Sequence, residues 1–209
     1  AAAAVRLTAP ESGAGFARDV IDRAQDVIAG VTAMRDGVDA LHREVSAGVG
    51  TTTARINVLL GQVHDANGAV ARLKAQGQAS AGPESQRHSA LAELAGLIGI
   101  TTSTQSDGRI FVTAQGGAAL VDARLRQIAP AGDTAAIGAG DLSADRPATT
   151  LDLIGPDGNV LRRDPWSPAG AGGTLGALIG ARDGQLPVAA FELHRVLSTV
   201  MQALNKASN

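Results

Sequence analysis

Residues 19–45 read DVIDRAQDVIAGVTAMRDGVDALHREV, and the apolar residues in this stretch recur at alternating spacings of four and three. They are Val20, Ala24, Val27, Val31, Met34, Val38, Leu41 and Val45. This spacing keeps one row of side chains on one face of a helix, where a partner helix can cover it. No proline occurs from Phe16 to Ala75. The sequence therefore predicts one long helix over these residues.

A second apolar row follows Val45 on the same expected helix. Its residues are Val49, Thr52, Ile56, Leu59, Val63, Ala66, Val70 and Leu73. Two spacings of four occur in succession where the rows join, which is a stutter of the heptad pattern. Gly48 and Gly50 lie at this point, and each costs about 1 kcal/mol relative to Ala inside a helix. A bend or a local unwinding is as consistent with the sequence as one straight helix.

The next segment predicts a shorter helix and then short strands. After a turn at 77–83, Pro83 can occupy the first turn of a helix that runs to about Ile98. Strands are expected at 100–105, 110–113, 119–121, 151–154 and 160–162, with turns at 106–109, 116–117 and 155–159 between neighbours. Residues 129–148 are rich in Ala, Gly, Asp and Pro and are expected to form a loop with at most one short strand.

Helical periodicity returns near the C-terminus. Thr174 can cap a short helix, and Pro187 is tolerated in the first turn of the next one. The last apolar row consists of Leu186, Ala190, Leu193, Leu197, Val200 and Leu204. We expect this row to pack on the long helix, with Leu197 closing the bundle, and the strands to form a lobe joined by flexible Gly/Pro segments.

The expected fold class is α+β. A long antiparallel helical bundle, similar to a coiled coil, carries a small inserted β domain. The expected helical domain comprises residues 1–99 and 174–209. The expected β domain comprises residues 100–173 and includes the Gly/Pro-rich connector at its end.

The composition limits the chemistry of the chain. None of the 209 residues is Cys, which excludes disulfides, thiol nucleophiles and thiolate metal sites. The net charge is −2 and the 18 Lys and Arg residues form no cluster longer than two, so we expect no nucleic-acid or membrane surface. No stretch approaches the roughly 20 apolar residues of a membrane span, and residues 1–4 lack the features of a signal peptide.

The residues that could carry chemistry do not form a known motif. No two of the four histidines, which are His42, His64, His88 and His194, have the i, i+4 spacing of a zinc-binding helix. The glycine-rich run 170–176 lacks the Lys of a phosphate-binding loop, and we expect a flexible connector there. Trp166 is expected to pack at the domain boundary, and Arg182 with Asp183 to form a solvated ion pair. We therefore expect no catalytic residue, no cofactor-binding residue, no metal site and no cofactor.

Three stretches of the sequence match the pattern of one known family in their order and spacing. The first is Ile56-Asn57-Val58-Leu59-Leu60-Gly61-Gln62-Val63-His64-Asp65-Ala66-Asn67. The second is residues 91–100 followed by Asp107-Gly108, Gly116-Gly117 and Leu120-Val121. The third is Gly173-Thr174-Leu175-Gly176-Ala177-Leu178 with Arg182-Asp183 and Leu186-Pro187. Together these stretches resemble the flagellar hook-associated protein 1 family, the hook-filament junction proteins. Of the family's Asp-Gln-Arg-Asp element before the second helix, only Gln86 and Arg87 remain.

The resemblance implies a structural subunit and no enzyme activity. It implies an extracellular place in the bacterial flagellum, which serves motility, and secretion through the flagellar type III export apparatus without a cleaved signal. The implied partners are copies of the protein in a ring, the hook protein, a neighbouring hook-associated junction protein and an export chaperone. The family's terminal heptad segments are absent at both ends. We therefore expect an internal fragment that is mainly monomeric in dilute solution, with mixed charge and no apolar patch on its exposed helix faces.

The alternative function is a helical coiled-coil adaptor or binding module, whose long helices recruit a partner coiled coil. A stable dimer through Val20, Val27 and Met34 would favour this alternative. The sequence upstream and downstream in the parent reading frame would separate the two readings.

Overall fold

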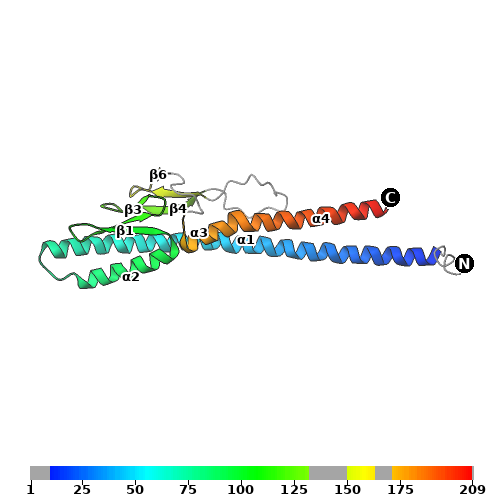
Figure 1. Cartoon of the computed structure of the whole chain (residues 1–209), viewed down its shortest axis with the longest axis horizontal. Coiled ribbons are helices and arrows are strands. Elements are labelled where there is room, and N and C mark those ends of the chain that lie inside the picture. Colours follow the sequence, from blue (N-terminus) through cyan, green and yellow to red (C-terminus); the bar gives the residue numbers. More distant parts are fainter. Residues whose placement is uncertain (1–9, 132–149, 163–170, 209) are drawn as a thin grey trace. The chain divides into compact units, whose positions relative to one another are not determined.

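The computed structural model describes residues 10–131, 150–162 and 171–208, with side chains over 22–131, 150–162 and 171–203. The helices are α1 (Pro10–Ala75), α2 (Ala81–Leu97), α3 (Gly173–Gly180) and α4 (Leu186–Ser208), with a π-helical turn η3 (Ala181–Gln185) before α4. The strands are β1 (Ile100–Thr104), β2 (Ile110–Ala114), β3 (Ala119–Val121), β4 (Gln127–Ala131), β5 (Thr150–Ile154) and β6 (Val160–Arg162). Figure 1 shows these elements, which confirm the α+β class.

The strands form two antiparallel three-stranded sheets. Their orders are β1-β2-β3 and β4-β5-β6, so every pair of neighbours is also consecutive along the chain. The predicted hairpins are confirmed, since Thr104 pairs with Ile110 and Ile154 pairs with Val160. The turns between them place Gly108 and Gly158 at φ of 86° and 79°, a conformation that favours glycine.

Strand β4 extends into residues 129–148, which the sequence predicted to be a loop with at most one short strand. Among the described strands β4 pairs only with β5, and none of them lies on its other edge. Ile128 directs its N–H to that edge, and Pro130, two residues later, has its missing N–H on the same side. Proline is therefore compatible with this strand. Most of the predicted loop, residues 132–149, lies outside the described residues.

The chain divides into two compact units. One contains α1 up to Leu41 and α4 from Val188, and the other contains His42–Pro187. Helix α1 contributes to both units. The predicted division into a helical domain (1–99 and 174–209) and a β domain (100–173) follows secondary structure, and it stays a prediction.

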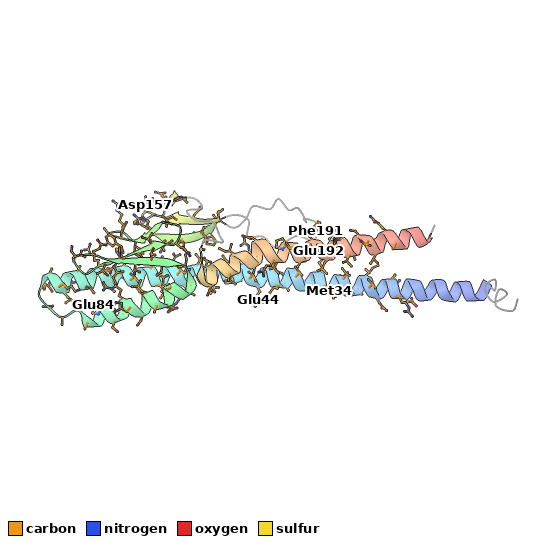
Figure 2. The ribbon with its side chains drawn as sticks, viewed as in Figure 1. Met34, Glu44, Glu84, Asp157, Phe191 and Glu192 are labelled. Carbon is orange, nitrogen blue, oxygen red and sulfur yellow. The ribbon has the colours of Figure 1, made fainter. Side chains whose placement is uncertain are left out.

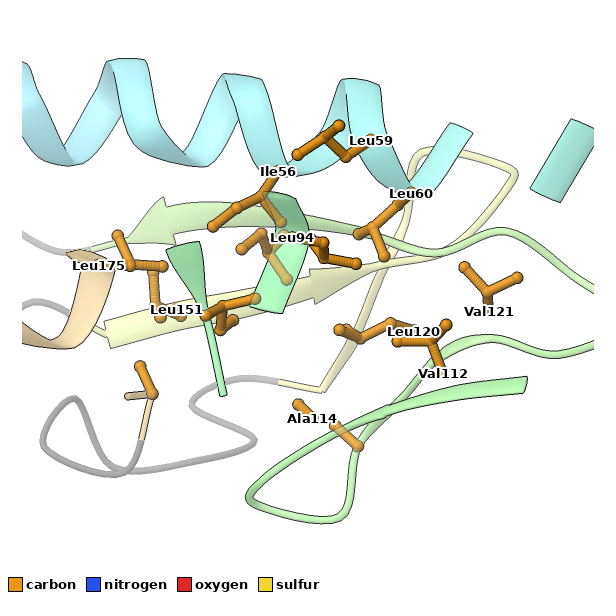
Figure 3. Packing of buried hydrophobic residues seen from close by; sticks show 14 of the residues in the cluster. Ile56, Leu59, Leu60, Leu94, Val112, Ala114, Leu120, Val121, Leu151 and Leu175 are labelled. Atoms are coloured by element: carbon orange, nitrogen blue, oxygen red, sulfur yellow. The ribbon is translucent and has the colours of Figure 1, made fainter. Parts of the chain in front are cut away.

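The His42–Pro187 unit has one hydrophobic core to which helices and both sheets contribute. Leu120 of β3 and Leu151 of β5 are buried with Ile56 of α1, Leu94 of α2 and Leu175 of α3 (Figure 3). The expectation that the strands are only loosely joined to the helices is therefore wrong. Leu197, which is expected to close the bundle, has a partly buried side chain, and its role there stays a prediction.

Helix α1 continues through the stutter without interruption. A Cβ on Gly48 would lie 3.5 Å from the Leu178 side chain of α3, which is an ordinary van der Waals contact. Most of the second apolar row is buried as predicted, namely Val49, Ile56, Leu59, Val63, Ala66 and Val70. In the first row Val31 is buried, but Val27, Met34 and Leu41 are exposed.

Candidate functional site

The histidines do not converge on a site. His42 is buried, His64 is half-buried, and His88 and His194 are exposed. His42 and His64 both lie on α1, about 33 Å apart by the helical rise. Among the described residues, no group of three or more His, Cys, Asp or Glu is placed to hold a metal ion.

The glycine-rich run before α3 is a close-packed junction, which corrects the expected flexible connector over its described part, 171–176. Gly172 and Gly173 have φ of 63° and 57°, and a Cβ on Gly173 would lie 2.6 Å from the Leu97 carbonyl carbon. The Gly99 N–H donates to the Ala171 carbonyl at 2.7 Å. Thr174 is not the N-cap, because Gly172 occupies that position and the Thr174 hydroxyl donates to the Gly96 carbonyl at 3.2 Å. Trp166 lies outside the described residues.

Asn67 of α1 attaches the first sheet through its side-chain amide, which forms hydrogen bonds with the backbone of β2 as a neighbouring strand would. The Ile110 N–H donates to Asn67 Oδ1 at 2.9 Å, and Asn67 Nδ2 donates to the Ile110 carbonyl at 2.7 Å. Asn67 is 2% exposed, so both bonds are shielded from water. The side chain thus satisfies a buried donor and a buried acceptor at the start of β2, which would otherwise be costly to bury.

Asn57 makes the same contact with the second sheet. The Ile128 N–H donates to Asn57 Oδ1 at 2.9 Å, and Asn57 Nδ2 donates to the Ile128 carbonyl at 2.8 Å. Ile128 lies on the edge of β4 that has no neighbour among the strands that the structure describes. Two asparagines ten residues apart on α1 therefore attach one sheet each.

Arg87 of α2 completes the contact at Asn67. Its Nη1 donates to Asn67 Oδ1 at 3.0 Å and to the Gly108 carbonyl at 2.8 Å, and the residue is 4% exposed. Burial lowers the pKa of Arg87, and the nearby Glu84 carboxylate opposes that effect. Arg87 therefore joins α2 to Asn67 of α1 and to the β1–β2 turn at Gly108.

Sequence reasoning did not identify Asn57, Asn67 and Arg87 as a functional set. The available signal was an asparagine, a poor helix former, at two positions inside the predicted helix, each directly after a residue of the apolar row. Asn67 lies seven residues from Leu60 and Leu60 seven from Thr53, so all three share one buried face of α1. Polar residues on such a face need partners, and here the partners are strands distant in sequence.

Exposed ion pairs surround this polar set. Arg55 of α1 donates two bonds to Glu93 of α2 at 2.6 and 2.7 Å, and the Arg55 hydrogen bond lowers the pKa of Glu93. Lys74 lies 3.1 Å from Glu84, whose pKa is lowered first by the Ser80 hydroxyl and then by Lys74. Glu93 also lines a groove of about 700 Å³ between α1 and α2, whose lining includes Gln62, Asp65 and Gln86.

One pair that was expected to be solvated is buried. Arg182 of η3 is 3% exposed, and its Nε donates to Asp183 at 2.9 Å. The prediction of a surface ion pair was therefore wrong for Arg182. The charge of the guanidinium is compensated inside the fold rather than by solvent.

The unit formed by α1 and α4 exposes apolar side chains, which corrects the expectation that its helix faces lack an apolar patch. Met34 is 60% exposed and Phe191 is 55% exposed (Figure 2). Val27, Met34 and Leu41 follow one another at intervals of seven residues, the spacing of a helix-packing row. An open, largely apolar groove of about 520 Å³ lies beside Met34, with Leu193 on its α4 side.

Within 10–131 and 171–208, none of the helices combines the length and the apolar character that a bilayer crossing requires.

Comparison with known proteins places this arrangement in a family. Residues 6–209 match the model of a family described as the flagellar hook-associated protein FlgK helical domain. A solved structure of the flagellar hook junction protein FlgK from Burkholderia pseudomallei is similar in fold, with a TM-score of 0.62 and 23% sequence identity. The similarity covers 77% of this chain and 27% of that one, so the chain spans about a quarter of that protein's length. No curated protein matches the chain.

Proposed function

Because the chain belongs to the family of the flagellar hook-associated protein FlgK helical domain, we propose that it is part of a structural subunit that joins hook to filament in a bacterial flagellum. The observation that carries this proposal is the family match, which extends over residues 6–209. The fold of the FlgK structure from Burkholderia pseudomallei supports it. The proposed subunit acts by packing against its neighbours and performs no catalysis.

The proposed partners are copies of the same protein in a ring, the hook protein and a neighbouring hook-associated junction protein. The exposed row Val27, Met34 and Leu41 supports contacts with other helices, because exposed apolar residues at heptad spacing are suited to helix packing. We place the protein outside the cell, reached through flagellar type III export with the help of an export chaperone. The chain alone is expected to be mainly monomeric in dilute solution.

Deletion of the parent gene in the source bacterium tests the function. We expect cells that carry hooks without attached filaments and release filament subunits into the medium, with recovery when the intact gene is restored. Antibodies against this chain should label the point where hook meets filament in electron micrographs. Normal filaments after the deletion, or labelling elsewhere, would contradict the proposal.

The same exposed row favours one alternative, a coiled-coil adaptor that recruits a partner helix. The deletion separates the two functions, because an adaptor outside the flagellum leaves the filaments attached. A stable dimer through Val27 and Met34 that persists at submicromolar concentration would support the adaptor.

A further inference from the structure

The chain contains one Asn-Gly dipeptide, Asn67-Gly68, and it lies where α1 holds the first sheet. In an unfolded chain this dipeptide is prone to intramolecular attack on the side-chain amide. Glycine has no Cβ, so its backbone nitrogen is accessible and its backbone adopts the required geometry easily. The other internal asparagines precede Val58, Val160 and Lys206, which hinder the same attack.

We propose that Asn67 is a deamidation site that is open in the unfolded chain and closed in the folded one. The Gly68 backbone nitrogen forms a bond to Cγ of Asn67, the bond from Cγ to the side-chain nitrogen breaks, and ammonia leaves with the proton of the Gly68 N–H. The product is a five-membered succinimide. Water then opens one of its two carbonyl groups and leaves either aspartate or isoaspartate, without any change of oxidation state.

The fold blocks the first step of this reaction. Residues 67 and 68 lie inside α1, where the helix fixes the backbone and engages its N–H groups. Hydrogen bonds to Ile110 of 2.7 and 2.9 Å and the 3.0 Å bond from Arg87 direct the Asn67 amide to the sheet. At 2% exposure the amide is also shielded from water.

The modification would in turn impair folding. In aspartate a second carboxylate oxygen replaces Nδ2, which lies 2.7 Å from the Ile110 carbonyl oxygen, so two acceptors would face each other. Arg87 can balance the new charge, but it cannot supply the donor that the Ile110 oxygen loses. Isoaspartate additionally inserts a methylene group into the backbone of α1. A chain that deamidates before folding is therefore expected to attach the first sheet poorly.

The contact at Asn57 provides an internal control. Asn57 makes the same pair of backbone bonds to Ile128, but Val58 follows it. Gly68→Ala provides a second control, because a Cβ there meets no atom within 4 Å and Ala is the better helix former. The proposal rests on these residues and not on the proposed function.

The test incubates the whole chain, folded and in denaturant, at the same pH and temperature, and measures aspartate and isoaspartate at each asparagine by peptide mass spectrometry. We expect Asn67 to react at least about 100-fold more slowly in the folded chain, because only about 10⁻³ or less of a stable protein is unfolded at any time. In denaturant, Asn57 should react far more slowly than Asn67, and Gly68→Ala should reduce the Asn67 rate to the Asn57 level. Equal rates in the folded and denatured chains, or equal rates at Asn57 and Asn67 in denaturant, would overturn the proposal.

Asn67→Asp tests the consequence for folding. We expect it to unfold at a lower denaturant concentration than Gly68→Ala, with faster hydrogen exchange in β1 and β2. A variant that fails to fold supports the same conclusion. An unfolding midpoint equal to that of the original chain would show that deamidation at Asn67 does not impair the fold.

Discussion

Leu120 and Leu197 provide a matched test of where the stability of this protein lies. Leu120 in β3 is 0% exposed and belongs to the core shared by α1, α2 and both sheets, whereas Leu197 in α4 is half-buried. Leu120→Ala removes three buried carbons, a loss of roughly 2.4 kcal/mol at about 0.8 kcal/mol each. The cavity left behind raises the expected cost to about 2–5 kcal/mol. Leu197→Ala removes the same atoms from a partly hydrated site and should cost less than about 1.5 kcal/mol.

Hydrogen exchange with mass spectrometry resolves the effect by segment, because the two residues lie in different compact units. Leu120→Ala should accelerate exchange in α1 from residue 56 to 70 and lower the denaturant midpoint of that segment. Leu197→Ala should leave the segment unchanged. If Leu197→Ala destabilises residues 56–70 as much as Leu120→Ala does, the core does not lie where the packing places it.

Four further outcomes follow from the structure. Gly173→Ala should lower the free energy of unfolding by at least about 2 kcal/mol in urea titrations, because φ is 57° and the new Cβ would lie 2.6 Å from the Leu97 carbonyl carbon. The control Gly50→Ala, where a Cβ meets no atom within 4 Å, should raise the free energy of unfolding by up to about 1 kcal/mol. A Gly173→Ala variant with unchanged stability would contradict the packed junction. Arg87→Met should cost about 1–3 kcal/mol in the same titration, because the Gly108 carbonyl loses its buried donor, and an unchanged midpoint would argue against that contact. The pKa of Glu84 is lowered by the Ser80 hydroxyl and by Lys74, so the stability it contributes is present above its unfolded pKa and is lost as pH falls through the folded pKa. The urea midpoint of unfolding should therefore decrease as the pH falls below about 4.5, and it should decrease less steeply in Glu84→Gln. An identical pH profile in that variant would refute the linkage. Zinc, calcium or a nucleotide should leave the melting temperature unchanged, and a reproducible rise of several degrees would contradict the structural role.

The sequence predicted the elements better than it predicted their burial. Spacings of four and three in α1 identified a helix correctly along its described length. The same spacing describes Val63, which is buried, and Met34, which is 60% exposed. A heptad row shows which face of a helix can be covered, but what covers it depends on residues far away in the chain.

The contacts that attach the sheets could not be predicted, because each joins residues far apart in sequence. Asn57 and Asn67 carry a recognisable local signal, since asparagine is disfavoured inside a helix. Their partners Ile128 and Ile110 carry none, because the contact uses backbone groups that every residue possesses. Thr174 shows the opposite case, in which a strong local capping signal was overridden by the glycine junction with Gly96–Gly99.

The attachment of both sheets to one helix sets an order for folding. A three-stranded sheet is close to the smallest sheet that is stable alone. Each sheet is therefore expected to depend on its packing against α1 for stability. The bond from Asn67 to Ile110 closes a loop of 43 residues, and the bond from Asn57 to Ile128 closes one of 71. Loop closure costs more entropy as the loop grows, and contacts of high sequence separation slow folding. The pair α1 and α2 is therefore expected to form first, the sheet β1-β2-β3 to dock next, and the sheet β4-β5-β6 to complete the unit in the slowest step.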